Sequence, residues 1–406
     1  MFCKDSKKSG NLSYFSEIKK SEEITTEIYR ILLRNTDMDE KDAILRSLLP
    51  NCEFLSEDIE VIGKSNKIKS YFVTKPNDDF KFLHETSIIE YHGKIFASWY
   101  NNKKIELQGY TPIRFSVSAD CGKTWREPVT VVGDRDAKIL YCPPVFGIED
   151  DKLYMFLNRM VSADHMHSLD LYIYNEEDNR FNLLWSKPIP FKLNTNVYKM
   201  SNGKLIMPGR IAALDGFPQI PAVMISDNGK INSEWRMVKI NPDKMLPDGS
   251  EFIHPEVSLI LKDNKIYAFC RNDQRNVPLV FLSDDYGENW QGPIATDIPF
   301  SSSKIYSGTL KDGRNYIIGN IGANHVDREI LYILFSSDNT MKFNKGFVLQ
   351  DGFSKELDAG YEWSYPCAHE SDGKLYIIYT IVFDENNERG AVLSVIDLKD
   401  ITYIFG

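Results

Sequence analysis

Residues 372–380, which read Asp-Gly-Lys-Leu-Tyr-Ile-Ile-Tyr-Thr, contain the pattern that decides the fold of this chain. A turn comes first, a basic residue follows, and an apolar run then ends on a polar residue. Turns of this Asx-Gly type between apolar segments are signals for β-hairpins, so each copy predicts two antiparallel strands. Six copies, each with room for about four strands, are typical of a six-bladed β-propeller. The other five copies begin at His92, Asp151, Asn202, Asp263 and Asp312.

The composition agrees with an all-β fold and excludes some functions. The chain has 406 residues, of which 12% are aromatic, and aromatic residues are enriched in strands. Its formal net charge is −10, and no run of Lys and Arg could form a stripe for phosphates, so we expect no nucleic-acid partner. The six cysteines are scattered without a Cys-x-x-Cys pair. We therefore expect no disulfide framework, no metal site and no cofactor.

The N-terminal part has a different pattern. Apolar residues such as Ile24, Ile28 and Ile31 recur at helical spacing within residues 17–49, which predicts two short helices packed on the main body. The first residues are polar and no apolar run is long enough for a signal peptide or a membrane span, so we expect a cytoplasmic location and no membrane contact. The predicted division is a helical extension at 1–60 and a propeller at 61–406.

A second motif, Ser-x-Asp-x-Gly-x-x-Trp, occurs at residues 118–125 and again at 283–290. Degenerate copies begin at Ser226 and Ser336. The Ser and Asp side chains suit hydrogen bonds to a tight turn, and the Gly suits a positive φ. The motif resembles the Asp-box (BNR) repeat of sialidases and their relatives, and the resemblance covers nearly all of residues 80 to 400. It implies the propeller fold more strongly than any chemistry, because the box is a structural turn.

Polar residues stand where the predicted strands begin or end near the axis. Apolar strands have no packing reason to end on Arg and Asn, and a polar ring around an axis suits the hydroxyl groups and carboxylate of a sugar. We therefore expect a small-molecule or oligosaccharide ligand. The candidate residues are His84, Glu85, Arg159, Asn196, Arg210, His254, Glu256, Arg271, Tyr361 and Tyr365.

The resemblance assigns roles to some of these residues. Sialidases hold the substrate carboxylate with three arginines and use a Tyr nucleophile assisted by a Glu. Glu256, followed fifteen positions later by Arg271, resembles the family's Glu and Arg pair, and Arg328 resembles a further arginine of the site. Tyr365 stands where the nucleophile would begin the last blade. A free Tyr has a pKa of about 10 and needs such a carboxylate to take its proton.

Two positions depart from the family pattern. Sialidases open the first blade with Phe-Arg-Ile-Pro, whereas this chain has His84 where that arginine is expected. The acidic loop that follows keeps one carboxylate, Glu106, so His84, Glu85 and Glu106 all stay open as the general acid. The function expected from the resemblance is an exo-acting glycoside hydrolase that releases a terminal acidic sugar. The alternatives are a non-catalytic glycan-binding propeller and a propeller enzyme for a different acidic sugar.

Overall fold

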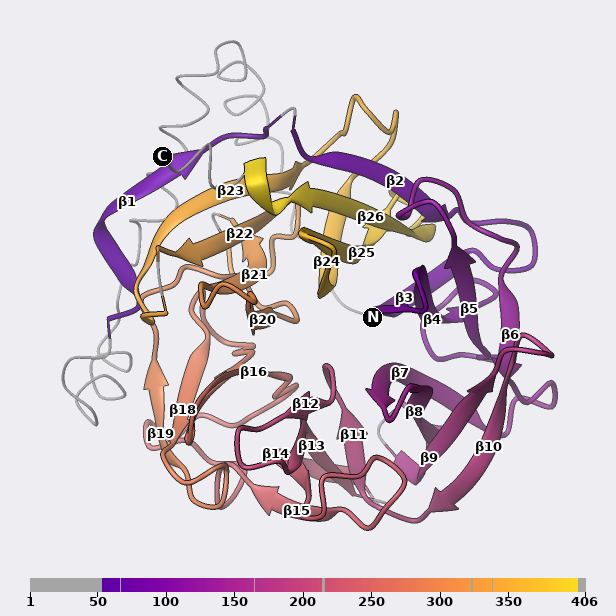
Figure 1. The fold of residues 1–406 in the computed structure, drawn as a ribbon, viewed down its shortest axis with the longest axis horizontal. Helices are drawn as coiled ribbons and strands as arrows, with labels where there is room; N and C mark the ends of the chain where they lie inside the picture. The colour runs from indigo at the N-terminus through magenta and orange to yellow at the C-terminus, as the bar shows by residue number, and fades with distance from the viewer. Residues whose placement is uncertain are drawn as a thin grey trace, which may run out of the picture.

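Six β-sheets are arranged radially around one central axis (Figure 1), which confirms the six-bladed propeller. This is a computed structural model that describes residues 53–65, 67–163, 165–213, 216–322, 324–337 and 339–400. The two helices predicted within residues 17–49 lie outside the described residues. In the described part of the chain, no helix has the length and apolar character needed to span a membrane.

Each blade is a sheet of antiparallel strands, to which blade 5 adds one parallel outer strand, and the first strand of each blade lies nearest the axis. Blade 1 contains β3 (Phe82–Tyr91), β4 (Lys94–Asn102), β5 (Ile113–Ser118) and β6 (Val129–Val132). Blade 2 contains β7 (Leu140–Glu149), β8 (Lys152–Ser162), β9 (His165–Asn175) and β10 (Arg180–Lys187). Blade 3 contains β11 (Phe191–Leu193), β12 (Tyr198–Lys199), β13 (Leu205–Ala213), β14 (Gly216–Ser226) and β15 (Arg236–Lys239).

The second half of the ring repeats this arrangement. Blade 4 contains β16 (Val257–Lys262), β17 (Lys265–Cys270), β18 (Leu279–Ser283) and β19 (Gln291–Ala295). Blade 5 contains β20 (Tyr306–Thr309), β21 (Asn315–Ile321), β22 (Ile330–Ser336), β23 (Phe343–Asp351) and β1 (Leu55–Ile62). Blade 6 contains β24 (Glu362–Ser371), β25 (Lys374–Val382), β26 (Arg389–Asp397) and β2 (Lys69–Thr74).

The first two strands of the chain complete the last two blades. β2 pairs antiparallel with β26 and thereby joins the N-terminal side of the propeller to its C-terminal blade. β1 runs parallel to β23 on the outer edge of blade 5. The predicted domain boundary after residue 60 falls inside β1, so residues 55–60 form a strand of a blade instead of part of a helical extension. Pairing with β23 decides this, and that strand lies nearly 300 positions away in the sequence.

The core consists of apolar layers between neighbouring blades. Along β17, Ile266 and Ala268 pack with residues of blade 3, whereas Phe269 packs with residues of blade 5. This alternation is the two-residue period of a strand, and here both faces are buried. Such burial explains why the second strands of the blades read as nearly continuous apolar runs.

The Asp-boxes close hairpins, as their sequence predicts. In the first box the Ser118 hydroxyl accepts a hydrogen bond from the backbone N–H of Gly122 (2.8 Å), and Asp120 accepts one from that of Thr124 (2.9 Å). The Trp125 indole donates to the carbonyl of Gly122 (3.0 Å). The second box repeats these three bonds at residues 283–290 with nearly the same distances. The Asp of the degenerate copy that begins at Ser336 lies outside the described residues.

Candidate active site

The side chains of the candidate site are presented by irregular strands. We call the end of the axis where the innermost strands begin the upper end, and the end with the first hairpin turn of each blade the lower end. The ladders of β3, β7 and β24 each shift register near the upper end, between His84 and Ser87 in the first case. Glu85 and Tyr365 lie in these irregularities with φ of 54° and 58°. Bulges re-aim side chains, and strained backbone of this kind gathers at functional sites.

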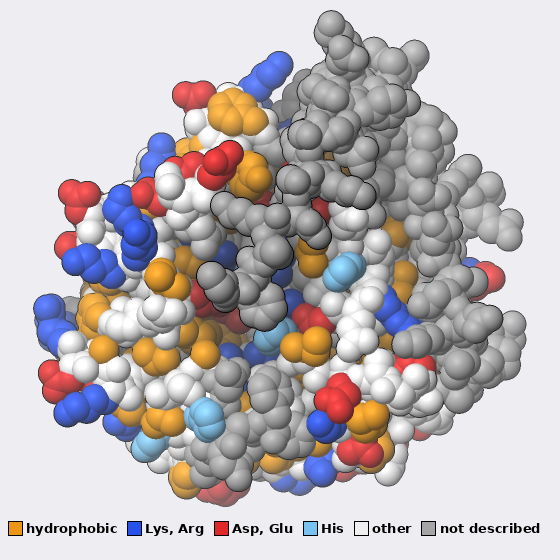
Figure 2. Space-filling model, turned by 180° about the vertical axis from the view of Figure 1, so that it is seen from behind, with side chains coloured by type: hydrophobic (Ala, Val, Ile, Leu, Met, Phe, Trp, Pro, Cys, Tyr) orange, Lys and Arg blue, Asp and Glu red, His pale blue; other side chains and the backbone are white. Residues whose placement is uncertain are grey.

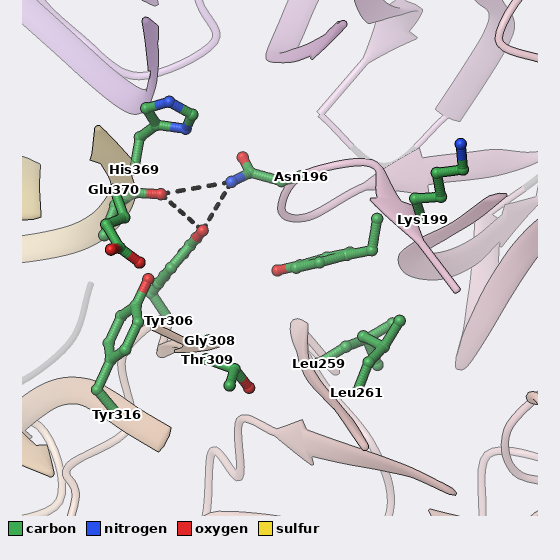
Figure 3. A pocket seen from close by; sticks show the side chains of 12 residues that line it. Asn196, Lys199, Leu259, Leu261, Tyr306, Gly308, Thr309, Tyr316, His369 and Glu370 are labelled. Atoms are coloured by element: carbon green, nitrogen blue, oxygen red, sulfur yellow. Dashed lines mark hydrogen bonds between the residues drawn. The ribbon is translucent and has the colours of Figure 1, made fainter. Parts of the chain in front are cut away.

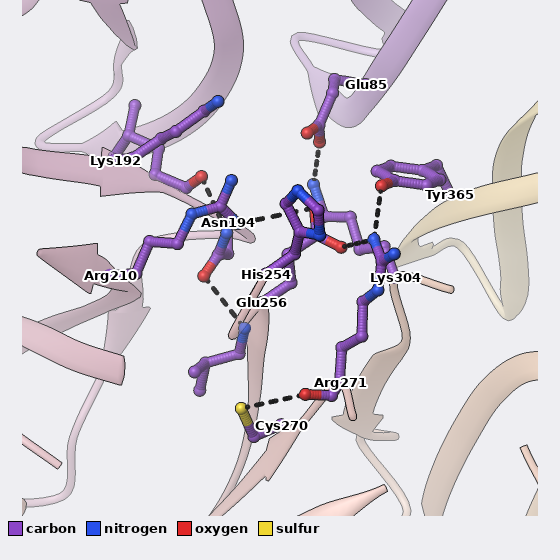
Figure 4. A network of polar contacts seen from close by, with 12 residues as sticks. Glu85, Lys192, Asn194, Arg210, His254, Glu256, Cys270, Arg271, Lys304 and Tyr365 are labelled. Atoms are coloured by element: carbon purple, nitrogen blue, oxygen red, sulfur yellow. Dashed lines mark hydrogen bonds and ion pairs between the residues drawn. The ribbon is translucent and has the colours of Figure 1, made fainter. Parts of the chain in front are cut away.

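Arg271 joins three of the predicted residues into one network (Figure 4). Its Nη1 donates to Glu256 Oε2 and to the Tyr365 hydroxyl, each at 2.9 Å. Its Nη2 lies 2.7 Å from Asp273 Oδ1, and its Nε donates to the Ser302 hydroxyl at 3.3 Å. Arg271, Glu256 and Tyr365 are at most 9% exposed, so these bonds are made away from water. The structure thus brings together residues 256, 271 and 365, as the sequence predicts.

A second buried ion pair crosses the axis. Lys304 Nζ bonds to Glu85 Oε2, and the two residues are 4% and 6% exposed. Burial raises the pKa of Glu85, Glu256 raises it further, and Lys304 acts in the opposite direction. Burial alone would lower the pKa of Lys304, but Glu85 and Glu256 outweigh it and raise that pKa. The Lys304 ammonium, 5.8 Å from the centre of the Tyr365 ring, therefore stays charged.

Electrostatics keep Glu256 ionised and Tyr365 protonated in the free protein. Burial raises the pKa of Glu256, but Arg271, Arg210 and Lys304 together lower it to about 2. Burial raises the pKa of Tyr365 and Glu256 adds to the rise, while Arg271 and Arg328 oppose it. The Arg328 guanidinium lies 5.5 Å from the centre of the Tyr365 ring.

His84 lies against Tyr365, whereas Glu106 is bound to Tyr100. The His84 ring centre lies 3.9 Å from that of Tyr365, and its Nδ1 is 2.9 Å from the Thr380 hydroxyl. Burial, together with the charges of four cations, puts the pKa of His84 well below its usual value, so the imidazole is neutral. Glu106 accepts a hydrogen bond from the Tyr100 hydroxyl at 2.7 Å, which ties it to the side of blade 1.

Arg210 brings unused hydrogen-bond donors into the cluster. It is 4% exposed, and its Nε and Nη1 are buried without a hydrogen-bond partner among the described residues. Its nearest carboxylate oxygen, Glu256 Oε1, lies 3.7 Å from Nη1, beyond hydrogen-bond distance. A buried guanidinium with unmet donors is suited to an anionic or strongly accepting group of a ligand.

The sequence reasoning missed Arg389, which lies at the start of β26. Its guanidinium stands 4.4 Å above the Phe82 ring, and its Nε donates to Asn387 Oδ1 at 2.8 Å. Burial lowers the pKa of Arg389, and the charge of Glu106 acts in the opposite direction. Arg389 begins the third strand of its blade, and no hairpin-turn or Asp-box motif marks this position in the sequence.

The remaining candidates lie at the rim of the cluster or outside it. The His254 ring reaches Asp273 at 3.3 Å and its side chain is 45% exposed. Arg159 lies opposite Tyr141 on blade 2, and its buried Nε has no described partner. Tyr361 is 44% exposed and has no described contact with the cluster. Asn196 bonds to the Tyr306 hydroxyl at 2.6 Å, on the lower side of the channel. The predicted placement of Asn196 in the upper site is therefore corrected, whereas Tyr361 directly precedes β24 at the upper end.

Charged side chains also reach the surface near the axis. Figure 2 shows Lys and Arg, Asp and Glu, and His side chains in the hollowed centre of one face of the molecule. Within the residues that the structure describes, no three His, Cys, Asp or Glu side chains are placed to hold a metal ion together. The arrangement is thus a set of cations around three carboxylates, those of Glu85, Glu256 and Asp273, and one Tyr.

The chain is similar to proteins of known family and known structure. A model of the BNR repeat-like domain matches residues 93–377. Sialidase from Trypanosoma rangeli in complex with sialic acid superposes with a TM-score of 0.62 at 14% identity, over 84% of this chain and 60% of that one. A Hadza microbial sialidase gives 0.62 at 10% identity, over 82% and 69% of the two chains. A Dyadobacter fermentans protein of unknown function gives 0.62 at 12%, over 82% and 99%. A search of curated proteins finds no significant match.

Proposed function

Because the chain belongs to the BNR repeat-like domain family and shares the fold of sialidases, we propose that it is an exo-acting glycoside hydrolase for a terminal acidic sugar. The observation that carries this proposal is the network in which Arg271 holds both Glu256 and the Tyr365 hydroxyl. The two sialidases described above are matched over 69% and 60% of their own length, so their activity is transferred here only as a proposal.

The proposed reaction proceeds through a covalent intermediate. Tyr365 Oη attacks the anomeric carbon, its proton passes to Glu256, and the bond from that carbon to the leaving oxygen breaks. Glu85 in its protonated form, which its raised pKa favours, protonates the leaving oxygen. Water then attacks the anomeric carbon, Glu85 takes a proton from the water, and the Tyr365 oxygen departs and recovers the proton held by Glu256.

The arginines explain how binding of an acidic substrate makes Glu256 a better base for the Tyr365 proton. In the free protein Arg271 and Arg210 hold the pKa of Glu256 at about 2, which makes Glu256 a weak base. A substrate carboxylate placed between Arg210, Arg328 and Arg389 competes for the positive charge that stabilises Glu256. Glu256 then becomes more basic when an acidic sugar is bound, and a neutral sugar lacks this effect.

One alternative has an observation in its favour. The low pKa of Glu256 and the raised pKa of Tyr365 both oppose formation of a tyrosinate in the free protein. A propeller that binds an acidic glycan without cleaving it would need the arginines and would not need this proton transfer. The alternative function is therefore a glycan-binding propeller that uses the same cluster.

The test is hydrolysis of aryl sialosides, aryl uronides and neutral aryl glycosides by the purified protein. We expect cleavage of an acidic glycoside with retention of configuration, a loss of about 10²–10⁴-fold in kcat for Glu256→Gln, and no measurable turnover for Tyr365→Phe. Lys187→Met, which alters an ion pair on the outer strand β10, is the matched control and should keep full activity. If no glycoside is cleaved while an acidic sugar raises the melting temperature, the binding function replaces the hydrolase. If Tyr365→Phe keeps the activity, the site assignment is wrong.

A further inference from the structure

The lower end of the axis contains a pocket of ≈240 Å³ that the proposed hydrolysis does not use (Figure 3). Its walls come from blades 3, 4, 5 and 6, and we call it the lower pocket. The residues on which the argument depends are Asn196, Tyr198, Leu259, Leu261, Tyr306 and Tyr316. From these walls we infer that the lower pocket is a second binding site, specific for one unit of a neutral sugar.

The lower pocket is separate from the upper charged cluster. Glu256 lies just before β16, and Leu261 stands five residues further down the same strand. At about 3.3 Å per residue, this places the two some 16 Å apart along the axis. A small cavity of ≈10 Å³, lined by Asn194, Lys304 and Cys367 among others, shares Asn196 with the lower pocket. None of the residues that line the lower pocket belongs to the upper cluster of Arg210, Glu256, Arg271, Lys304 and Tyr365.

The walls of the lower pocket are aromatic and carry uncharged polar groups. Burial raises the pKa of Tyr198 to about 12 and raises those of Tyr306 and Tyr316 well above their usual value, so all three hydroxyls stay protonated. The Tyr306 hydroxyl donates to the carbonyl of Ala368 at 2.7 Å and accepts from the Asn196 amide at 2.6 Å. These bonds fix the ring of Tyr306 and the amide of Asn196 in the positions seen in Figure 3.

This combination suits the two kinds of surface that a sugar presents. The C–H faces of a pyranose pack on aromatic rings and on apolar side chains such as Leu259 and Leu261, while its hydroxyls bond to tyrosine hydroxyls and amides. Gly308 helps to shape the wall, since a Cβ there would lie 2.6 Å from the Tyr316 hydroxyl. The volume is below the roughly 300 Å³ of pockets for drug-sized ligands, which favours a single sugar unit.

Charge favours a neutral ligand over an acidic one. The charged residues that line the lower pocket have opposite signs, Lys199 and Glu370, and Figure 3 shows the Lys199 side chain extending away from the tyrosines. Burial lowers the pKa of His369 to about 4, against the opposing effect of Glu90, so this imidazole is neutral. The lower pocket thus lacks the cluster of arginines that suits an acidic sugar at the upper end.

The experiment is saturation-transfer NMR of methyl α-glucoside, methyl α-mannoside and methyl β-galactoside at about millimolar concentration with the purified protein. We expect at least one glycoside to bind. Thr309→Trp, at an exposed position on the wall, should fill the space and weaken that binding about ten-fold or more. Asn196→Ala should weaken it about three- to ten-fold through the loss of one or two neutral hydrogen bonds. Tyr365→Phe should bind as the wild type does, whether or not the hydrolase proposal is right.

Three results would overturn the inference. One is the absence of saturation transfer to all three glycosides, and another is equal binding by wild type, Thr309→Trp and Asn196→Ala. The third is binding that Tyr365→Phe weakens and Thr309→Trp does not, because the sugar would then occupy the upper cluster. Lys187→Met on the outer strand β10 serves as the control for both wall variants, and circular dichroism checks that the variants are folded.

Discussion

Replacing Lys304 by Met should destabilise the protein strongly, and more so at high pH than at low pH. The substitution removes the partner of Glu85 in a pair whose side chains are 5% and 7% exposed. Removal of one partner from a buried ion pair costs about 3–5 kcal/mol, because the other charge stays buried without compensation. The exposed pair of Lys187 and Glu234 gives the contrast, because Glu234 is 91% exposed and Lys187→Met should cost less than about 1 kcal/mol.

The pH dependence follows from the carboxyl that is left behind. The pKa of Glu85 is already raised in the folded protein, and Lys304 is the group that lowers it, so the substitution moves this pKa further up. A carboxyl with a higher pKa in the folded than in the unfolded state keeps its proton in the folded state over the pH range between the two values. Stability is therefore lost as the pH rises through that range, by up to about 1.4 kcal/mol per pH unit. Glu85 is protonated at the acidic end, where the deficit of Lys304→Met is smallest.

The assay is urea unfolding of wild type, Lys304→Met and Lys187→Met at mildly acidic, neutral and mildly alkaline pH. The double variant Glu85→Gln with Lys304→Met removes both charges and should recover most of the lost free energy of unfolding. Equal deficits for Lys304→Met and Lys187→Met would refute the reasoning. So would a deficit of Lys304→Met that grows toward acidic pH, or a double variant less stable than the single one.

Three further predictions concern the boxes and the upper site. Gly122→Ala should lower the free energy of unfolding by about 1–3 kcal/mol more than Gly93→Ala in thermal melts, because a Cβ at Gly122 would lie 2.2 Å from the Leu393 side chain whereas one at Gly93 meets nothing within 4 Å. Similar losses for the two variants would contradict this. Both glycines have positive φ, so about 1–2 kcal/mol of backbone strain is common to the pair. Hydrogen bonds from Thr124 hold the pKa of Asp120 at about 2, so its stabilisation is present above the unfolded value of 3.8 and is lost below it. In Asp120→Asn, the melting temperature should therefore fall less steeply with decreasing pH over this acidic range than in the wild type. An unchanged slope would contradict the prediction. Arg389→Met should raise KM for a cleaved acidic aryl glycoside about ten-fold with a smaller effect on kcat, and an unchanged KM would remove Arg389 from the site.

Some site residues were found from the sequence because each strand carries its own signal. The turns that open the six hairpins mark where strands begin, so the ends of those strands could be numbered. Arg271, at the end of one such strand, and Glu256, at the start of its partner, are adjacent across a single hairpin, and the backbone N–H of Arg271 donates to the carbonyl of Glu256. Their proximity follows from local pairing alone.

Other site residues could not be found in this way. Arg389 belongs to a third strand, whose inner end has no distinctive sequence pattern. Asn196 was assigned to the upper end, but its amide bonds to Tyr306, which comes from blade 5, on the lower side of the channel. The chain bends between β11 and β12, so the number of residues past the start of the blade did not give the height of Asn196 along the axis.

The sequence by itself determined the number of blades, the hairpin turns and the Asp-boxes. These depend on the two-residue period of strands and on the conformations that Gly and Asx residues allow, which act over a few residues. Only the tertiary structure decided which charges meet. Glu85 and Lys304 are 219 positions apart, and Arg271 and Tyr365 are 94 positions apart. Closure of the ring sets these distances, and long-range electrostatics and burial then set the pKa of each group that the closure brings to the axis.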